Sequence, residues 1–141
     1  MQDRLMVATD EITLRATSAS LLAAEVRIPA GGGPPALHRH APEEIYRGEA
    51  GELAVYCEDD DGEVQRIPVG PGDVVHIPGG RSHTVRNESA AEARAYVVFS
   101  PGVEMERFVR AAAQLRSPTP ADVMALARRH GIEFAHAAVP A

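Results

Sequence analysis

Four side chains in two separate stretches of the sequence could together bind one metal ion. His38, His40 and Glu44 lie in the first stretch, and His83 lies in the second. Side chains alternate between the two faces of an extended segment, so His38 and His40 are expected to point the same way. Glu44 also lies at an even offset, although a turn at Pro42 could break this alternation. We therefore predict that the first stretch supplies two histidine ligands.

Three imidazoles and one carboxylate form a mixed nitrogen and oxygen ligand set. Such a set suits a divalent transition metal ion, namely Fe, Mn, Ni, Co, Cu or Zn. On an octahedral ion, four protein ligands leave two positions free for water, substrate or dioxygen. Sites that keep positions open serve catalysis or ligand capture rather than structural stabilisation. The expected cofactor is thus one such ion per chain, and the spacing does not fix which metal it is.

The residues between 4 and 100 show the pattern of a sheet protein. Short extended segments are separated by Gly, Pro and Asp turns, and no helical period is present. This pattern predicts an all-β fold, an antiparallel sandwich or barrel. Asp61-Gly62 predicts a two-residue hairpin between two of the strands. The expected strands cover residues 5–8, 12–17, 21–28, 36–40, 44–47, 52–57, 63–67, 73–77, 82–87 and 93–99.

The period changes after residue 100, and two amphipathic helices are expected there. Ser100-Pro101 is read as the N-cap and first turn of one helix, and Thr119-Pro120 as the start of the other. Each helix should cover the barrel or a neighbouring subunit. We predict a barrel over residues 1–100 and a helical extension over 101–141, together one domain, with a loose tail at 136–141.

Composition excludes several classes of function. The 141 residues carry a formal charge of −6, which argues against a nucleic-acid or anionic-membrane partner. No apolar run approaches the ~20 residues that cross a bilayer, and no secretory signal is evident, so a cytoplasmic location is expected. All 14 basic residues are arginine, so no lysine can form a Schiff base. Cys57 has no partner for a disulfide and reads as a small buried residue.

The two stretches resemble the paired motifs of the cupin superfamily. Further segments, at residues 31–35, 93–102 and 128–134, are similar to small single-domain cupins of the quercetin-2,3-dioxygenase-like kind. The resemblance covers about residues 21–134. It implies a double-stranded β-helix, or jelly-roll, barrel with the metal inside. The motifs read Gly32-x5-His38-x-His40-x3-Glu44-x6-Gly51 and Gly72-x5-Pro78-x-Gly80-x2-His83-x3-Asn87.

The sequence predicts the carboxylate ligand and the residues of the pocket wall less directly than it predicts the histidine ligands. Glu43 competes with Glu44 as the ligand, and the spacing of the motif favours Glu44. Alternation places Tyr46 on the face of Glu44, Val85 on the face of His83 and Ala36 beside His38, so these three are candidate substrate-pocket residues. In the strand at 52–57, either Leu53, Val55 and Cys57 or Ala54 and Tyr56 must face the barrel interior, and the sequence alone does not choose.

Three classes of function fit this site. The leading hypothesis is a metal-dependent dioxygenase that acts on a small phenolic or enolisable molecule, with Glu44 as both ligand and catalytic base. The second is a redox-neutral isomerase, cyclase or decarboxylase that uses the metal as a Lewis acid. The third is a non-catalytic module that binds a small molecule. A homodimer is also expected, because edge strands such as residues 5–8 need to be covered.

Overall fold

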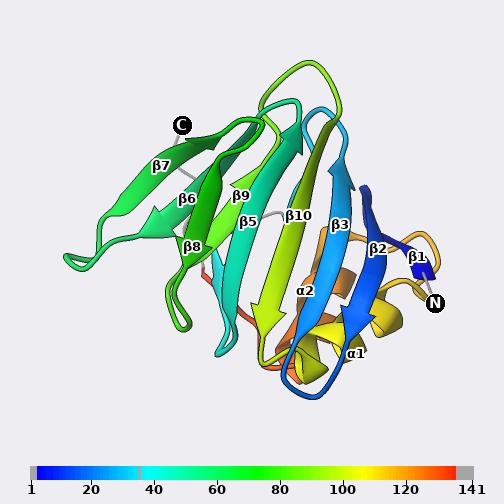
Figure 1. Ribbon diagram of the computed structural model, residues 1–141. Coiled ribbons are helices and arrows are strands. Elements are labelled where there is room, and N and C mark those ends of the chain that lie inside the picture. Colours follow the sequence, from blue (N-terminus) through cyan, green and yellow to red (C-terminus); the bar gives the residue numbers. More distant parts are fainter. Residues whose placement is uncertain (1–2, 35, 136–141) are drawn as a thin grey trace.

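The protein, described here by a computed structural model, folds as a jelly-roll barrel with two helices near its C-terminus (Figure 1). Residues 3–34 and 36–135 are described, and they form two antiparallel sheets. The larger sheet has the strand order β1-β2-β3-β10-β5-β8. Its strands are β1 (Asp3–Val7), β2 (Asp10–Thr17), β3 (Leu22–Ile28), β10 (Ala93–Ser100), β5 (Glu43–Ala50) and β8 (Val74–Ile77).

The smaller sheet faces the larger one and has the order β11-β4-β9-β6-β7. All ten strands expected from the sequence are present, and one further strand, β11, was missed. It pairs with β4 and so joins the C-terminal segment to the smaller sheet. The strands of this sheet are β11 (Glu133–Phe134), β4 (His38–Arg39), β9 (His83–Arg86), β6 (Leu53–Glu58) and β7 (Val64–Val69).

The hydrophobic core lies between the two sheets. Strand β10 shows why: Ala93, Ala95, Val97 and Phe99 alternate with more exposed residues, and all four belong to the central core cluster. The same alternation fixes the orientation of β6, which the sequence left open. Its residues Leu53, Val55 and Cys57 join the central core, whereas Ala54 and Tyr56 pack with Leu37 in a second, smaller cluster.

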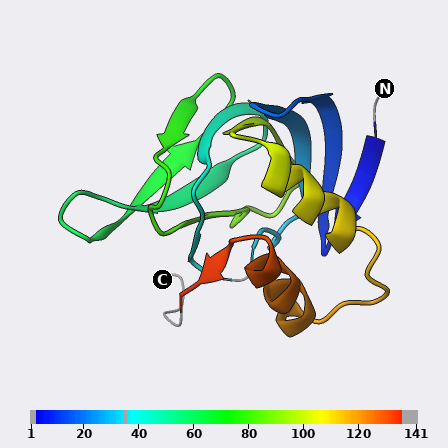
Figure 2. The ribbon, with the colours of Figure 1, turned by 90° about the horizontal axis from the view of Figure 1, so that it is seen from below.

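Two helices cover the interior on the side of β1–β3, as Figure 2 shows from below. Helix α1 (Val103–Ala112) buries Met105, Val109 and Ala112, and helix α2 (Pro120–Arg129) buries Val123 and Ala127. Thr119 caps α2 in a capping box with Asp122, as the Thr-Pro start predicted. No helix in the described ranges has the length and apolar character that a membrane crossing requires.

Two local predictions were wrong. Ser100 does not cap α1, because it is still part of β10, where its hydroxyl donates to the Ser20 carbonyl. The helix begins instead after Gly102, without a side-chain cap. The turn at Asp61-Gly62 does connect β6 to β7, but the connection runs over residues 59–63. Asp59 stabilises this longer loop, since its carboxylate accepts from the backbone N–H groups of Asp61 and Glu63.

The Asn87→Ala variant is expected to lose about 1–3 kcal/mol of unfolding free energy. The Asn87 side chain is buried, and its amide donates to the carbonyls of Ile28 and Ala91, at 2.8 Å in both cases. Alanine would remove this donor from the Ile28 carbonyl, and one buried unsatisfied group costs about 1–3 kcal/mol. Ala91 is exposed, and its carbonyl still accepts from the Ser89 hydroxyl. Urea unfolding would measure the loss. Gln65→Ala, which removes an exposed hydrogen bond to Asp59, should change stability by less than about 0.5 kcal/mol.

Candidate metal centre

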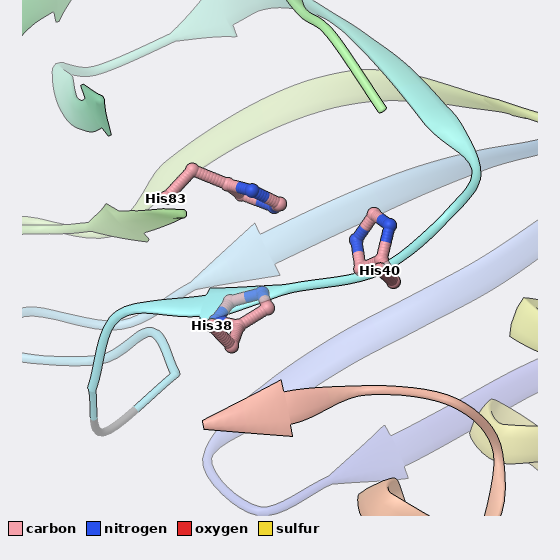
Figure 3. A group of neighbouring side chains, drawn as sticks. All are labelled: His38, His40 and His83. Atoms are coloured by element: carbon pink, nitrogen blue, oxygen red, sulfur yellow. The ribbon is translucent and has the colours of Figure 1, made fainter. Parts of the chain in front are cut away.

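Three histidines from two adjacent strands point toward a common centre (Figure 3). His38 lies on β4, His40 follows directly after it, and His83 is the first residue of β9. His38 and His83 are direct cross-strand partners, which brings together residues 45 positions apart in the sequence. The candidate ligand atoms of the three rings all lie within 4.8 Å of one another. The structure therefore contains a histidine cluster that could hold a metal ion.

Backbone carbonyls orient all three rings in the same way. The Nδ1 atoms of the three histidines lie 3.1 Å from the Ala36 carbonyl, 2.9 Å from that of Pro42 and 2.8 Å from that of Arg81. A carbonyl oxygen can only accept, so each Nδ1 must carry the proton and donate it. In a neutral imidazole this leaves the Nε2 lone pair free to bind a metal. Such hydrogen bonds hold ring and tautomer in place before an ion arrives.

Glu44, on β5, lies against two of the three histidines. Its Oε2 atom lies 2.8 Å from Nε2 of His40 and 2.5 Å from Nε2 of His83. Within the described residues, these three buried atoms have no hydrogen-bond partner. Leaving three buried polar atoms unsatisfied would be costly. Two donors bound at right angles to one ion, each about 2.1 Å away, lie roughly 3 Å apart. The short separations and the missing partners therefore fit ligands that surround an ion.

Electrostatics keep two of these groups in the form that binds metal. Burial lowers the pKa of His38 to about 3, so its ring is neutral at pH 7. Burial acts to raise the pKa of Glu44, but the adjacent His83 and His40 outweigh it, and the pKa lies below its ordinary value. Burial acts to lower the pKa of His83, yet contact with Glu44 leaves it raised. A carboxylate and a neutral imidazole are the ligand forms that a metal requires.

The structure separates Glu44 from its competitor. Glu44 is buried beside the histidines, whereas Glu43 is exposed on the outer face of β5 and contacts His76 at 2.8 Å. The register explains the difference, because adjacent residues of a strand face opposite sides. Arg39 likewise points away from its histidine neighbours and pairs with Glu133.

A cavity of about 140 Å³ opens beside the cluster, and His38, His40 and Glu44 form part of its wall. Tyr46 and Val85, both expected from alternation, line it. Ala36 is not among the lining residues; its carbonyl instead orients His38. Most of the remaining wall is apolar and comes from both sheets and from the C-terminal segment, as with Val26, Val97, Phe99, Met105, Phe108 and Phe134.

Sequence reasoning missed part of this wall. The C-terminal residues were expected only to cover the barrel, yet Met105, Phe108 and Phe134 face the ligand space. Their amphipathic spacing was visible in the sequence, but nothing in it showed what the apolar face would meet. Asp10 was missed too, since a single acidic residue at the start of a strand carries no sequence signal for a site.

The volume sets the size of molecule that the cavity can enclose. An engineered cavity of roughly 150 Å³ in another protein accommodates benzene. The space here is of similar size, so it encloses about one small ring or a short chain. A larger ligand would extend beyond the cavity.

Comparison with known proteins assigns the family. Residues 24–99 match the Cupin domain, and this match spans more than half of the chain. The protein therefore belongs to the cupin family. The resemblance to the cupin superfamily is confirmed, and so is the jelly-roll barrel expected from it. Comparison with curated protein sequences gave no match.

Three solved structures illustrate the shared fold. An RmlC-like cupin from Shewanella frigidimarina is 16% identical with a TM-score of 0.60, and the match covers 71% of this chain and 84% of that one. A cupin sugar phosphate isomerase from Silicibacter pomeroyi is 23% identical (TM-score 0.56; 67% and 60% covered). A Bacillus subtilis oxalate decarboxylase variant is 21% identical (TM-score 0.61; 70% and 27% covered). These likenesses establish the fold and leave the reaction open, because one fold hosts many activities.

Proposed function

We propose that the protein is a metal-dependent dioxygenase that acts on a small phenolic or enolisable molecule. The observation that carries this proposal is the placement of His38, His40 and Glu44 in the wall of an apolar cavity. Together with His83, these donors would bind one divalent transition metal ion and leave some of its coordination positions open. Such an ion would supply a Lewis acid with open positions for a substrate oxygen and for dioxygen. The identity of the metal is left to measurement, since this donor set accepts most first-row ions.

Glu44 is proposed to act as the base as well as a ligand. Its carboxylate is ionised and lies at the cavity wall. A phenol or an enolisable carbon that reaches the site must lose a proton, and a general base within hydrogen-bond distance contributes about 10²–10⁴-fold to such a step. The Nδ1 protons of the histidines are held by backbone carbonyls, so the rings are not free to accept from the substrate through that atom.

The apolar wall supports an oxygen-dependent reaction. Side chains such as Val26, Val97 and Phe99 line the site, and an apolar space favours dioxygen and a hydrophobic ring over water. The volume of about 140 Å³ favours a substrate with one ring or a short chain. A flavonol, with three rings, exceeds the enclosed space.

Oxygen uptake tests this proposal. Protein loaded with Fe, Mn, Ni, Co, Cu or Zn is incubated with a panel of single-ring phenols and short enolisable keto acids, with and without dioxygen. We expect oxygen consumption that depends on both metal and substrate. Turnover of a substrate under strictly anaerobic conditions would contradict the dioxygenase and favour a redox-neutral isomerase, cyclase or decarboxylase. Saturable binding without any conversion would favour a non-catalytic binding protein.

Glu44→Gln should lower kcat for any substrate found by at least about 100-fold. The amide keeps the size of the side chain but cannot accept the proton at neutral pH. Glu44 is also a proposed ligand, so metal content must be measured on the same sample and kcat expressed per bound metal. Glu43→Gln, which alters the exposed neighbour, is the matched control and should leave kcat unchanged. Equal kcat in Glu44→Gln and wild type would remove Glu44 as the base.

The homodimer and the cytoplasmic location remain predictions. Sedimentation velocity would separate a 15.0 kDa chain from an assembly of twice that mass.

A further inference from the structure

Two polar side chains outside the histidine cluster reach into the cavity. Apart from His38, His40 and Glu44, the side chains that line it in the described part of the chain are apolar except for Asp10 and Tyr46. A few convergent polar groups in an otherwise apolar pocket usually fix the orientation of a ligand. Neither the metal nor the proposed base requires a carboxylate at Asp10, so its presence calls for a separate explanation.

The strand register spreads these groups along the cavity. Tyr46 of β5 is the register partner of Val97 on β10, and Val97 is also the partner of Ala24 on β3. Ala24 in turn pairs with Leu14 of β2, so Tyr46 and Leu14 lie at the same level across the larger sheet. Asp10 precedes Leu14 by four residues, about 13 Å along the strand. Glu44 is displaced from Tyr46 in the opposite direction. Glu44, Tyr46 and Asp10 therefore follow one another along the cavity, with Asp10 farthest from the metal site.

The surroundings of Asp10 agree with this placement. It is close to the backbone N–H of Gly33 and to the charge of Arg86, and Arg86 is bound to the carbonyl of Pro34 at 2.9 Å. Arg86 is three residues beyond His83 on β9, about 10 Å along that strand. The hydroxyl of Tyr46 lies close to Glu44 and within electrostatic range of Asp10, so it is nearer the metal site than Asp10 is.

The Asp10 carboxylate has acceptor capacity to spare. Its Oδ1 accepts from the Thr9 hydroxyl at 3.0 Å, and the backbone N–H of Gly33 lies near the carboxylate. A carboxylate has about four acceptor positions. Burial raises the pKa of Asp10 to about 6 against the opposing effects of Thr9, Gly33 and Arg86, so the group is largely ionised at neutral pH. A partly desolvated carboxylate gains more from a new donor than a hydrated one does.

We infer that Asp10 binds a hydrogen-bond donor on the end of the ligand that lies away from the metal. The inference rests on the proposed function and narrows its substrate class. The substrate carries an oxygen that faces the histidines at one end and a hydroxyl or amine at the other, joined by one ring or a short chain. Asp10 is thus a specificity residue, and it takes no part in the chemical step.

A pair of isosteric phenols tests this role without turnover. 4-(Hydroxymethyl)phenol and 4-ethylphenol have the same shape, and only the first carries a donor at the far end. Binding to the cobalt(II)-loaded protein is measured by titration calorimetry under anaerobic conditions. In the wild type, the donor-bearing phenol should bind at least about tenfold more tightly, because a site built for a hydroxyl rejects the analogue that lacks it.

Asp10→Asn should weaken binding of 4-(hydroxymethyl)phenol about ten- to a hundredfold, as expected for a hydrogen bond to a charged group. Binding of 4-ethylphenol should stay within about twofold. Glu11→Gln is the matched control, since Glu11 is the adjacent acid of β2, contacts Arg4 at 3.2 Å and is not among the lining residues. Neither affinity should change in that variant.

The outcomes separate this inference from the proposed function. If both phenols bind the wild type and the ratio of their affinities is the same in Asp10→Asn, Asp10 does not select the ligand and only this inference fails. An unchanged ratio with a lowered Tm in Asp10→Asn would assign the residue to folding instead, which also overturns it. If neither phenol binds metal-loaded wild type, the proposed ligand class is wrong, and this inference fails with it.

Discussion

His83→Ala is expected to abolish stoichiometric metal binding. The ring of His83 lies between the other donors: it pairs with His38 across the strands and its Nε2 contacts Glu44. Removing a residue that only orients a ligand typically costs 10–100-fold in metal affinity, so removing a ligand itself should cost more than about 100-fold. Elemental analysis of proteins purified in parallel, after dialysis against a weak chelator, measures the difference.

His76→Ala is the control for this experiment, because His76 is an exposed histidine that pairs with Glu43 outside the barrel. It should keep the metal content of the wild type. A second readout is thermal stability, since an ion that binds only the folded state raises Tm with its concentration. The wild type and His76→Ala should show this rise, and His83→Ala should not. Equal metal in His83→Ala and wild type would mean that the ion binds elsewhere.

Gly33→Ala is expected to lower the unfolding free energy by about 3 kcal/mol or more. Gly33 has a φ of +115°, and a Cβ atom built there would lie 2.2 Å from the Val85 carbonyl oxygen. The left-handed backbone conformation alone costs a non-glycine residue about 1–3 kcal/mol. The added Cβ atom also clashes with a backbone atom, which cannot relieve the contact by a change of rotamer. The loop must therefore move away from β9. Because Gly33 and Val85 both line the cavity, ligand binding should weaken as well.

Gly31→Ala offers a matched comparison in the same loop. Its φ is +76°, but an added Cβ would meet no atom within 4 Å. Only the conformational cost of about 1–2 kcal/mol applies there. Urea unfolding of both variants should give Gly33→Ala a clearly lower free energy of unfolding than Gly31→Ala. Equal destabilisation of the two would show that the contact with Val85 does not constrain the loop.

The features that follow from local periodicity were predictable from the sequence. Alternation placed His38 and His40 on one face and put Tyr46 with Glu44, and the ten strands followed from short extended segments between turns. The resemblance to cupins supplied what periodicity cannot, namely that His83 would meet the first stretch. The Thr119 cap was also predictable, because a capping box is a local interaction.

The features that depend on packing were not predictable. A strand of two residues is too short to show an alternation of apolar and polar side chains, so the sequence did not predict β11. The contact of Phe134 with the site was therefore missed as well. Ser100 has the right type for a cap, but pairing with Glu43 of β5 keeps it in the sheet. Asp10 enters the cavity only because the barrel brings the start of β2 close to the loop at Gly33.

The pairing of β11 with β4 has a consequence for the whole C-terminal segment. Phe134 is the register partner of His38, and their ring centroids are 5.2 Å apart. An ion that fixes His38 would also favour the docked form of β11, and with it the two helices that close the cavity. Thermodynamic coupling is reciprocal, so the docked helices must tighten the hold on the ion by the same factor. We therefore expect metal binding and docking of the C-terminal segment to strengthen each other.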